Sequence, residues 1–221
     1  MSEIKKAGKI SPSIMCADFI NLGEELKQFE RLGIEYLHID IMDGVFVQNY
    51  TLGTDFIAKL HKATSIPLDI HLMIDEPERK LDWFDLKEDD YVSIHYESTR
   101  HVQRALQGIK DKGAKIMLAI NPATPLCVIE DIAEDLDGIL IMTVNPGFAG
   151  QKLVPQTLDK IRRAKELYPH LEIEVDGNVS YENAVKMRQA GADIFVGGTS
   201  SLFIKNKSFS ECVIELRNCI R

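Results

Sequence analysis

The residue types best able to do chemistry in this sequence are two histidines and two aspartates: His38, Asp40, His71 and Asp176. They stand at or near the ends of short apolar runs that are typical of β-strands, at Tyr36–Asp40, Pro67–Met73 and Leu171–Asp176. His38 and Asp40 are two residues apart, so on a strand both side chains point to the same face. Two imidazoles and two carboxylates that converge would suit one divalent metal ion per chain, either Zn²⁺, Fe²⁺, Mn²⁺ or Co²⁺.

Glycine-rich segments follow the later apolar runs, at Pro146–Gly150, Asp176–Asn178 and Val196–Thr199. Backbone amides in such turns can hold a phosphate, and a metal beside a phosphate pocket indicates an enzyme that acts on a phosphorylated small molecule. The sequence offers no lysine at a strand end for a Schiff base, no Ser-His-Asp set and no dinucleotide-binding fingerprint. The two carboxylates and a divalent cation are instead suited to removing a proton next to a carbonyl and returning one on the other face.

Other residues near the strand ends have less specific roles. Met42, Met73 and Met142 fall next to the polar strand ends, where we expect them to form an apolar floor under the substrate. His95 also ends an apolar run but has no paired carboxylate, so we expect it to line or pack the pocket. Asp43 suits either a turn or a contact in the metal site, and the sequence leaves both roles open. The remaining histidines fall on helices or loops, where we expect them to face solvent: His61, His101 and His170.

Strand-like and helix-like segments alternate along the chain. Strands are expected at Lys9–Met15, Tyr36–Asp40, Pro67–Met73, Tyr91–His95, Lys115–Ile120, Gly138–Thr143, Leu171–Asp176 and Ile194–Gly197. Helical patterns lie between them, at Asn21–Leu32, Gln156–Leu167 and Tyr181–Ala190, the last with Ser180 as its N-cap. Eight strands, each followed by a helix, give about 28 residues per unit over 221 residues. This predicts an α/β protein with a single (β/α)₈ TIM-barrel domain over residues 1–221.

An open doubly wound sheet is the competing architecture. It is disfavoured because no Gly-x-Gly-x-x-Gly motif follows the first strand, and because polar residues recur at the ends of many strands. That distribution fits a closed ring of strands with its site at their carboxyl ends.

The composition of the chain limits the kinds of binding partner and the location that we expect. The chain is 45% hydrophobic and 27% charged, with a formal net charge of −8 and dispersed basic residues, so we expect no nucleic acid partner. No apolar run approaches the roughly 20 residues of a membrane span, and the first residues lack the apolar core of a signal peptide. The four cysteines show no metal-ligand or redox spacing, which favours free thiols in the cytoplasm. We also expect a homo-oligomer.

Seven motifs in order make the chain similar to the ribulose-phosphate 3-epimerase family. They are Ser11-Pro-Ser-Ile-Met-Cys-Ala-Asp18, His38-Ile-Asp-Ile-Met-Asp-Gly44, Asp69-Ile-His-Leu-Met73, Asn121-Pro-Ala-Thr-Pro125, Val144-Asn-Pro-Gly-Phe-Ala-Gly-Gln151, Glu174-Val-Asp-Gly177 and Ala190-Gly-Ala-Asp193 with Gly198-Thr199. The resemblance implies a (β/α)₈ barrel, a divalent metal and epimerisation at C3 of a ketose phosphate. The common reaction of the family interconverts D-ribulose 5-phosphate and D-xylulose 5-phosphate.

The resemblance also implies residue roles. It gives His38, Asp40, His71 and Asp176 as metal ligands, with Asp40 and Asp176 as the proton acceptor and donor. Ser13 and His71 would touch the sugar. The phosphate end would be surrounded by Gly147, Phe148, Ala149, Gly150, Gly177, Asn178, Gly198 and Thr199.

Three positions depart from the usual family pattern. Gln48 stands where proline is usual, and Ala149 and Asn178 each stand where glycine is usual; Asn178 can keep its turn because asparagine tolerates the left-handed conformation. Several strings, among them Gly198-Thr-Ser-Ser-Leu-Phe203, are similar to the D-allulose-6-phosphate 3-epimerase branch, which leaves a ketohexose phosphate as an alternative substrate.

Two further interpretations belong to other classes. A phosphosugar-binding barrel without catalysis is disfavoured because both aspartates and both histidines are present. A barrel of the orotidine-phosphate decarboxylase type is disfavoured because Asp40-Ile-Met-Asp43 lacks the lysine of the Asp-x-Lys-x-x-Asp signature.

Overall fold

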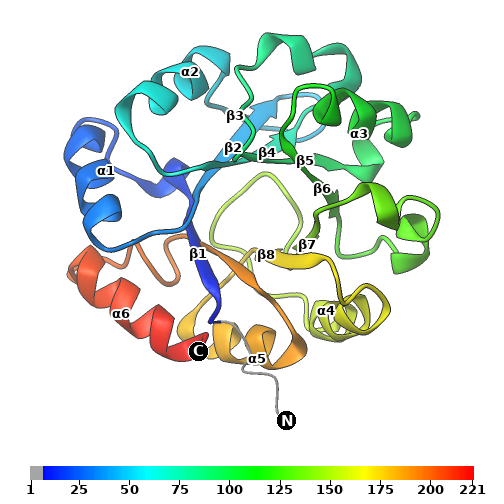
Figure 1. Cartoon of the computed structure of the whole chain (residues 1–221). Coiled ribbons are helices and arrows are strands. Elements are labelled where there is room, and N and C mark those ends of the chain that lie inside the picture. The colour runs from blue at the N-terminus through cyan, green and yellow to red at the C-terminus, as the bar shows by residue number, and fades with distance from the viewer. Residues whose placement is uncertain (1–6) are drawn as a thin grey trace.

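The computed structural model of the chain describes residues 7–221, and its centre is a ring of parallel strands (Figure 1). The strands of the ring are β1 (Lys9–Pro12), β2 (Leu37–Asp43), β4 (Leu68–Met73), β5 (Tyr91–His95), β6 (Lys115–Ile120), β7 (Gly138–Met142), β8 (Glu172–Asp176) and β9 (Ile194–Gly197). They pair in the order β1-β9-β8-β7-β6-β5-β4-β2, and β3 (Tyr50–Thr51) adds an antiparallel edge to β2. A parallel bridge between Ser13 and His38 joins β1 to β2 and closes the ring. The predicted (β/α)₈ barrel is thus confirmed.

Helices surround this ring, as Figure 1 shows. The α-helices are α1 (Leu22–Arg31), α2 (Thr54–Ala63), α3 (Val102–Lys110), α4 (Gln156–Leu167), α5 (Tyr181–Ala190) and α6 (Phe209–Cys219). The expectation of a helix after every strand is wrong at two places. The segments after β4 and β6 form only short 3₁₀ turns, at Pro77–Arg79, Leu81–Trp83, Leu126–Ile129 and Ala133–Asp135. Both segments are rich in aspartate, which has a low helix propensity, and both contain proline.

Most element boundaries agree with the sequence patterns. Three strands (β5, β6 and β9) and two helices (α4 and α5) have the predicted bounds, and the Ser180 hydroxyl accepts a hydrogen bond from the Asn183 amide as the N-cap should. The first strand is shorter than predicted, because the chain leaves the ring after Ser13 and enters a 3₁₀ turn at Ile14–Cys16. That early departure leaves Ser13 at the mouth of the barrel. Within residues 7–221, no helix combines the length and apolar character that crossing a bilayer requires.

The two faces of the strands have different compositions. The outward faces are apolar and pack against the helices in one continuous core. The inward faces of β1, β2, β4 and β8 carry polar side chains in stacked tiers, whereas those of β6 and β7 are apolar. The tier that meets in the middle of the barrel consists of Ser11, His38, Asp69 and Glu174, and the tier above it consists of Ser13, Asp40, His71 and Asp176. The register between β2 and β4 places residues of the same tier side by side: His38 lies opposite Asp69, and Asp40 lies opposite His71.

Candidate active site

The upper tier brings together the four residues singled out in the sequence. The Nε2 atom of His38 and the Nδ1 atom of His71 lie 3.3 Å and 3.4 Å from Oδ1 of Asp40. Oδ2 of Asp176 lies 3.9 Å from the same nitrogen of His71. One ligand atom from each residue lies within 4.8 Å of all the others. Both imidazoles are fully buried, whereas the Asp176 side chain is 20% exposed. The cluster therefore opens to solvent on its Asp176 side.

The buried nitrogens of the cluster fit a metal ion. Within residues 7–221, His38 Nε2 and His71 Nδ1 are buried without a hydrogen-bond partner, and a buried polar atom left unpaired typically costs about 1–3 kcal/mol. Two ligand atoms about 2.1 Å from a tetrahedral ion lie roughly 3.4 Å apart, which is close to the two nitrogen–oxygen separations found here. The donor set and its spacing therefore show that this cluster could bind a divalent metal.

The middle tier supports His38 from below. Nδ1 of His38 lies 2.6 Å from Oδ2 of Asp69, which also accepts a 2.8 Å hydrogen bond from the Ser11 hydroxyl. Because the carboxylate accepts the Nδ1 proton, the lone pair of the neutral His38 ring is on Nε2, facing the upper tier. His38, Asp69 and Glu174 form a second cluster of potential ligands, but His38 Nδ1 is already hydrogen-bonded to Asp69.

Sequence reasoning missed Ser11, Asp69 and Glu174. A signal for the two acidic residues was present, because each precedes a candidate ligand by two residues, as His38 precedes Asp40. That spacing places them on the inward face of the barrel.

The electrostatics of the two upper-tier carboxyl groups differ. Burial penalises the ionised form of both. At Asp40 the neighbouring His38 and His71 outweigh burial and lower the pKa. At Asp176 burial prevails, and the nearby negative charge of Asp40 helps it to raise the pKa. The site thus pairs one carboxylate that stays ionised with another that is readily protonated, which equips it to accept a proton and to donate one.

The pKa of His38 depends on its two neighbouring carboxylates. Burial disfavours its imidazolium form, but the carboxylates of Asp69 and Asp40 outweigh burial and raise its pKa well above the usual value. A proton and a divalent cation compete for the same lone pair, so metal binding at this site would release protons.

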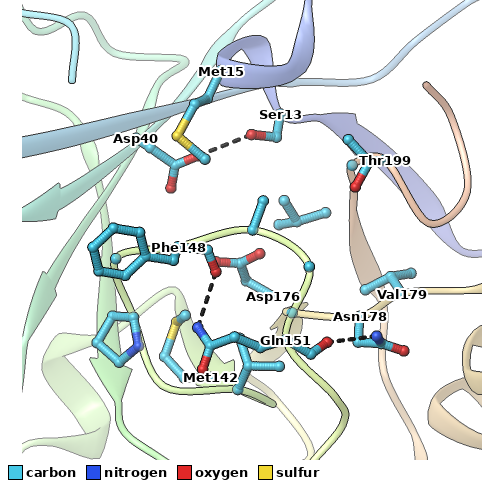
Figure 2. A pocket seen from close by; sticks show the side chains of 18 of the residues that line it. Ser13, Met15, Asp40, Met142, Phe148, Gln151, Asp176, Asn178, Val179 and Thr199 are labelled. Atoms are coloured by element: carbon cyan, nitrogen blue, oxygen red, sulfur yellow. Dashed lines mark hydrogen bonds between the residues drawn. The ribbon is translucent and has the colours of Figure 1, made fainter. Parts of the chain in front are cut away.

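A pocket lies directly above the upper tier at the carboxyl ends of the strands (Figure 2). The residues expected at the phosphate end all line it: Gly147, Phe148, Ala149, Gly150, Gly177, Asn178, Gly198 and Thr199. Ser13, Asp40, Asp176 and the three methionines of the expected floor line it as well. His71 does not. It is fully buried, so the expectation that it touches the sugar finds no support in its position.

Backbone amides at the rim of the pocket are available to an anion. Within residues 7–221, the amides of Gly177, Asn178 and Gly198 donate to no protein acceptor. Gly177 has a φ of 115°, and a Cβ there would lie 2.9 Å from the backbone nitrogen of Val144, so only glycine fits. Asn178 has a φ of 48°, which confirms that it keeps the left-handed turn in place of the usual glycine.

The segment between β7 and α4 crosses the barrel mouth, as the yellow-green loop at the centre of Figure 1 shows. It is braced by its own side chains and by neighbouring loops. Asn49 donates to the carbonyl of Gly147 at 2.9 Å, and Gln151 donates to that of Phe148 at 2.9 Å. The Phe148 side chain at its tip is 57% exposed. This loop therefore supplies the outer wall of the pocket.

The structure shows what Asp43 and the three remaining histidines contact. Asp43 shapes a turn: Oδ1 accepts from the amides of Val45 and Phe46, and Oδ2 accepts from Lys80 at 3.0 Å. The expectation that His61 faces solvent is wrong. Its side chain is only 6% exposed, and its Nε2 lies 2.9 Å from the buried Asp90 carboxylate. The other two histidines of that group, His101 and His170, are exposed as expected.

Comparison with known proteins gives the class of protein and then the family. Among solved structures the chain resembles other barrel proteins in fold alone. One is KGPDC from Streptococcus mutans, with a TM-score of 0.69, 10% identity and coverage of 97% of this chain and 98% of that chain. Another is orotidine 5'-phosphate decarboxylase from Pyrococcus horikoshii OT3, with a TM-score of 0.65, 16% identity and coverage of 96% and 99%.

The family is shown by sequence. Residues 9–203 match the model of the ribulose-phosphate 3 epimerase family. The ribulose-phosphate 3-epimerase of Bacillus subtilis is 44% identical over 197 residues, which cover 87% of this chain and 91% of that protein. The enzyme of the same name from Escherichia coli K12 is 37% identical over 214 residues, covering 95% and 94%. The chain belongs to the ribulose-phosphate 3-epimerase family.

Proposed function

We propose that this protein is a metal-dependent epimerase that interconverts D-ribulose 5-phosphate and D-xylulose 5-phosphate by moving the proton on C3. The observation that carries the proposal is the placement of Asp40 and Asp176, which line one pocket of a family member and whose pKa values are shifted in opposite directions. An epimerase needs a group that removes a proton from one face of a carbon and another that returns one to the opposite face.

The proposed metal is one divalent ion per chain, held by His38, Asp40, His71 and Asp176, with Zn²⁺, Fe²⁺, Mn²⁺ and Co²⁺ as candidates for this nitrogen and oxygen donor set. When bound, such an ion would supply Lewis-acid stabilisation of negative charge on the substrate oxygens. The buried nitrogens without partners support this assignment.

The chain's own residues would carry the proton transfers. In the direction from ribulose to xylulose phosphate, Asp40 and Asp176 act on opposite faces of C3, one as base and one as acid, and they exchange roles in the reverse direction. The Ser13 hydroxyl donates a 2.9 Å hydrogen bond to Oδ2 of Asp40 and fixes the orientation of that carboxylate. Met42, Met73 and Met142 exclude water from the apolar wall beneath the substrate.

The phosphate end of the substrate would bind the free amides of Gly177, Asn178 and Gly198, on the loops that follow β8 and β9. Fixed amides recognise the phosphate by position as well as by charge. They therefore set how many carbon atoms separate the phosphate from the reacting carbon.

The first prediction concerns the substrate. D-ribulose 5-phosphate should be converted with a kcat/KM at least about tenfold higher than D-allulose 6-phosphate. The hexulose has one more carbon between C3 and the phosphate, so a phosphate anchored at the glycine amides would displace its C3 from the two carboxylates. A coupled assay on both sugars measures the ratio. A higher value for the hexulose, or no turnover of either sugar, would contradict the proposal.

The second prediction concerns the metal. His71→Ala should reduce the metal content to well below one ion per chain and abolish most activity, because it removes a buried ligand nitrogen. Elemental analysis after gentle purification measures the loss. His101→Ala, at an exposed histidine outside the cluster, serves as the control and should leave both unchanged. Full metal content in His71→Ala would contradict the assignment of His71 as a metal ligand.

The third prediction concerns the proton transfers. Asp176→Asn should lower kcat by at least about 10²–10⁴-fold, because an amide cannot donate or accept the C3 proton. Wild-type product formed in D₂O should carry deuterium at C3, which mass spectrometry or NMR detects. Asp159→Asn, on the exposed face of α4, is the charge-matched control. Product without deuterium from the first turnover onward would point to a single shielded base.

The fourth prediction concerns the phosphate. Gly198→Val should raise KM at least about tenfold by blocking approach to the rim amides. The fold should tolerate the change, because among the described residues a Cβ at this position meets the Cys16 sulfur alone, at an ordinary contact distance of 3.6 Å. Gly23→Val in α1, where nothing lies within 4 Å of the added Cβ, controls for the extra bulk. An unchanged KM in Gly198→Val would count against this phosphate site.

A further inference from the structure

The second nitrogen of the His71 ring is engaged by another histidine. Nε2 of His71 lies 2.8 Å from Nε2 of His95, and both rings are fully buried. The rings are stacked with an interplanar angle of 27° and centroids 5.0 Å apart. Two N–H groups cannot face each other at this distance, so one nitrogen donates a proton and the other accepts it.

The next contact outward decides which nitrogen donates. Nδ1 of His95 lies 3.3 Å from Oε2 of Glu97. Although burial opposes ionisation, the hydrogen bonds from His95, Thr124 and Asn121 lower the pKa of Glu97 to about 2, so the carboxylate can only accept. The proton of neutral His95 must then be on Nδ1, and its Nε2 accepts the proton that His71 carries on Nε2.

The tautomer of His71 follows from these two hydrogen bonds, from His71 to His95 and from His95 to Glu97. When the ring is neutral and its proton is on Nε2, Nδ1 keeps a free lone pair. Nδ1 is the nitrogen that lies 3.4 Å from Asp40, and it has no hydrogen-bond partner within residues 7–221. We propose that Glu97 and His95 are positioning residues that fix the tautomer of His71 and thereby present its Nδ1 to the divalent ion. This inference rests on the metal site of the proposed function and adds two residues that lie outside it.

The other histidine of the cluster is held by a more direct device. The Asp69 carboxylate accepts the Nδ1 proton of His38 at 2.6 Å, with no group between them. For His71 the carboxylate lies one imidazole further out, on the 3₁₀ turn that follows β5. Both ligands therefore obey the same rule, in which a carboxylate behind the ring decides which nitrogen faces the metal.

We call the two hydrogen bonds from His71 through His95 to Glu97 the relay. Glu97→Gln can reverse the direction of both hydrogen bonds while keeping the size and shape of the side chain at position 97. Oε1 of Glu97 accepts hydrogen bonds from the backbone N–H of Asn121 at 2.9 Å and from the Thr124 hydroxyl. These donors would hold the amide oxygen of the glutamine and turn its NH₂ group toward His95. His95 would then accept at Nδ1 and donate from Nε2, so His71 would accept at Nε2 and carry its proton on Nδ1, which blocks the metal-facing lone pair.

The experiment uses the full chain labelled with ¹⁵N-histidine. In metal-free wild-type protein, at a pH where both rings are neutral, NMR of the ring nitrogens should show the His71 proton on Nε2 and the His95 proton on Nδ1. In Glu97→Gln both assignments should be reversed. Zn²⁺ affinity, measured by competition with a chromophoric chelator, should fall about 10–100-fold. Glu130→Gln removes an exposed carboxylate elsewhere in the loop after β6 and should leave both readouts unchanged.

The two readouts separate the possible failures. A wild-type His71 that carries its proton on Nδ1 would overturn the relay, and this measurement does not depend on the folding of any variant. Wild-type tautomers together with undiminished Zn²⁺ affinity in Glu97→Gln would also overturn it. A wild-type protein that binds no Zn²⁺ would instead overturn the metal site of the proposed function, whatever the tautomer of His71.

Discussion

The two-residue period of a β-strand, enforced inside a closed ring, is the constraint on which the site depends. It places side chains two apart on one inward face, so β2, β4 and β8 each contribute one residue to the middle tier and one to the upper tier. Ser11 on β1 and Ser13 just beyond it complete the two tiers. On β2 these are His38 and Asp40, and on β4 they are Asp69 and His71. Each residue that faces the pocket therefore lies two positions after a residue that supports the site from below.

A polar barrel interior has to satisfy its buried groups, and the way it does so defines where a ligand belongs. The Asp69 carboxylate takes hydrogen bonds from Ser11 and His38, and burial with the nearby Asp69 charge raises the pKa of Glu174, which favours its neutral form. Among the described residues, His38 Nε2 and His71 Nδ1 have no protein hydrogen-bond partner, and both nitrogens belong to the upper tier. Because unpaired buried nitrogens are costly, a native fold that retains them indicates a partner that the protein chain does not supply.

How far the sequence predicts this protein depends on whether a feature is local. The strand period and the strand-end positions predicted the barrel and the cluster of His38 and Asp176, because closure of the ring brings strand ends together. The burial of His61 was missed because its partner Asp90 is distant in sequence. The contact of His71 with His95 was missed for the same reason, since it joins neighbouring strands. The carboxylate that pairs with His95 was missed although Glu97 is only two residues away, because that contact depends on the 3₁₀ turn after β5. The oligomeric state stays a prediction, because no periodic pattern in the chain encodes it.

The order of strands explains how one barrel can act on two faces of a carbon. Asp40 lies on β2 and Asp176 on β8, and β1 and β9 stand between these strands in the ring. The two carboxyl groups therefore approach the pocket from different sides, as Figure 2 shows. Asp40 is near both histidines, which favour its ionised form, while Asp176 sits at the more open edge with a raised pKa. A flat intermediate held between them would meet a base on one face and an acid on the other, which is the arrangement that inversion of one carbon requires.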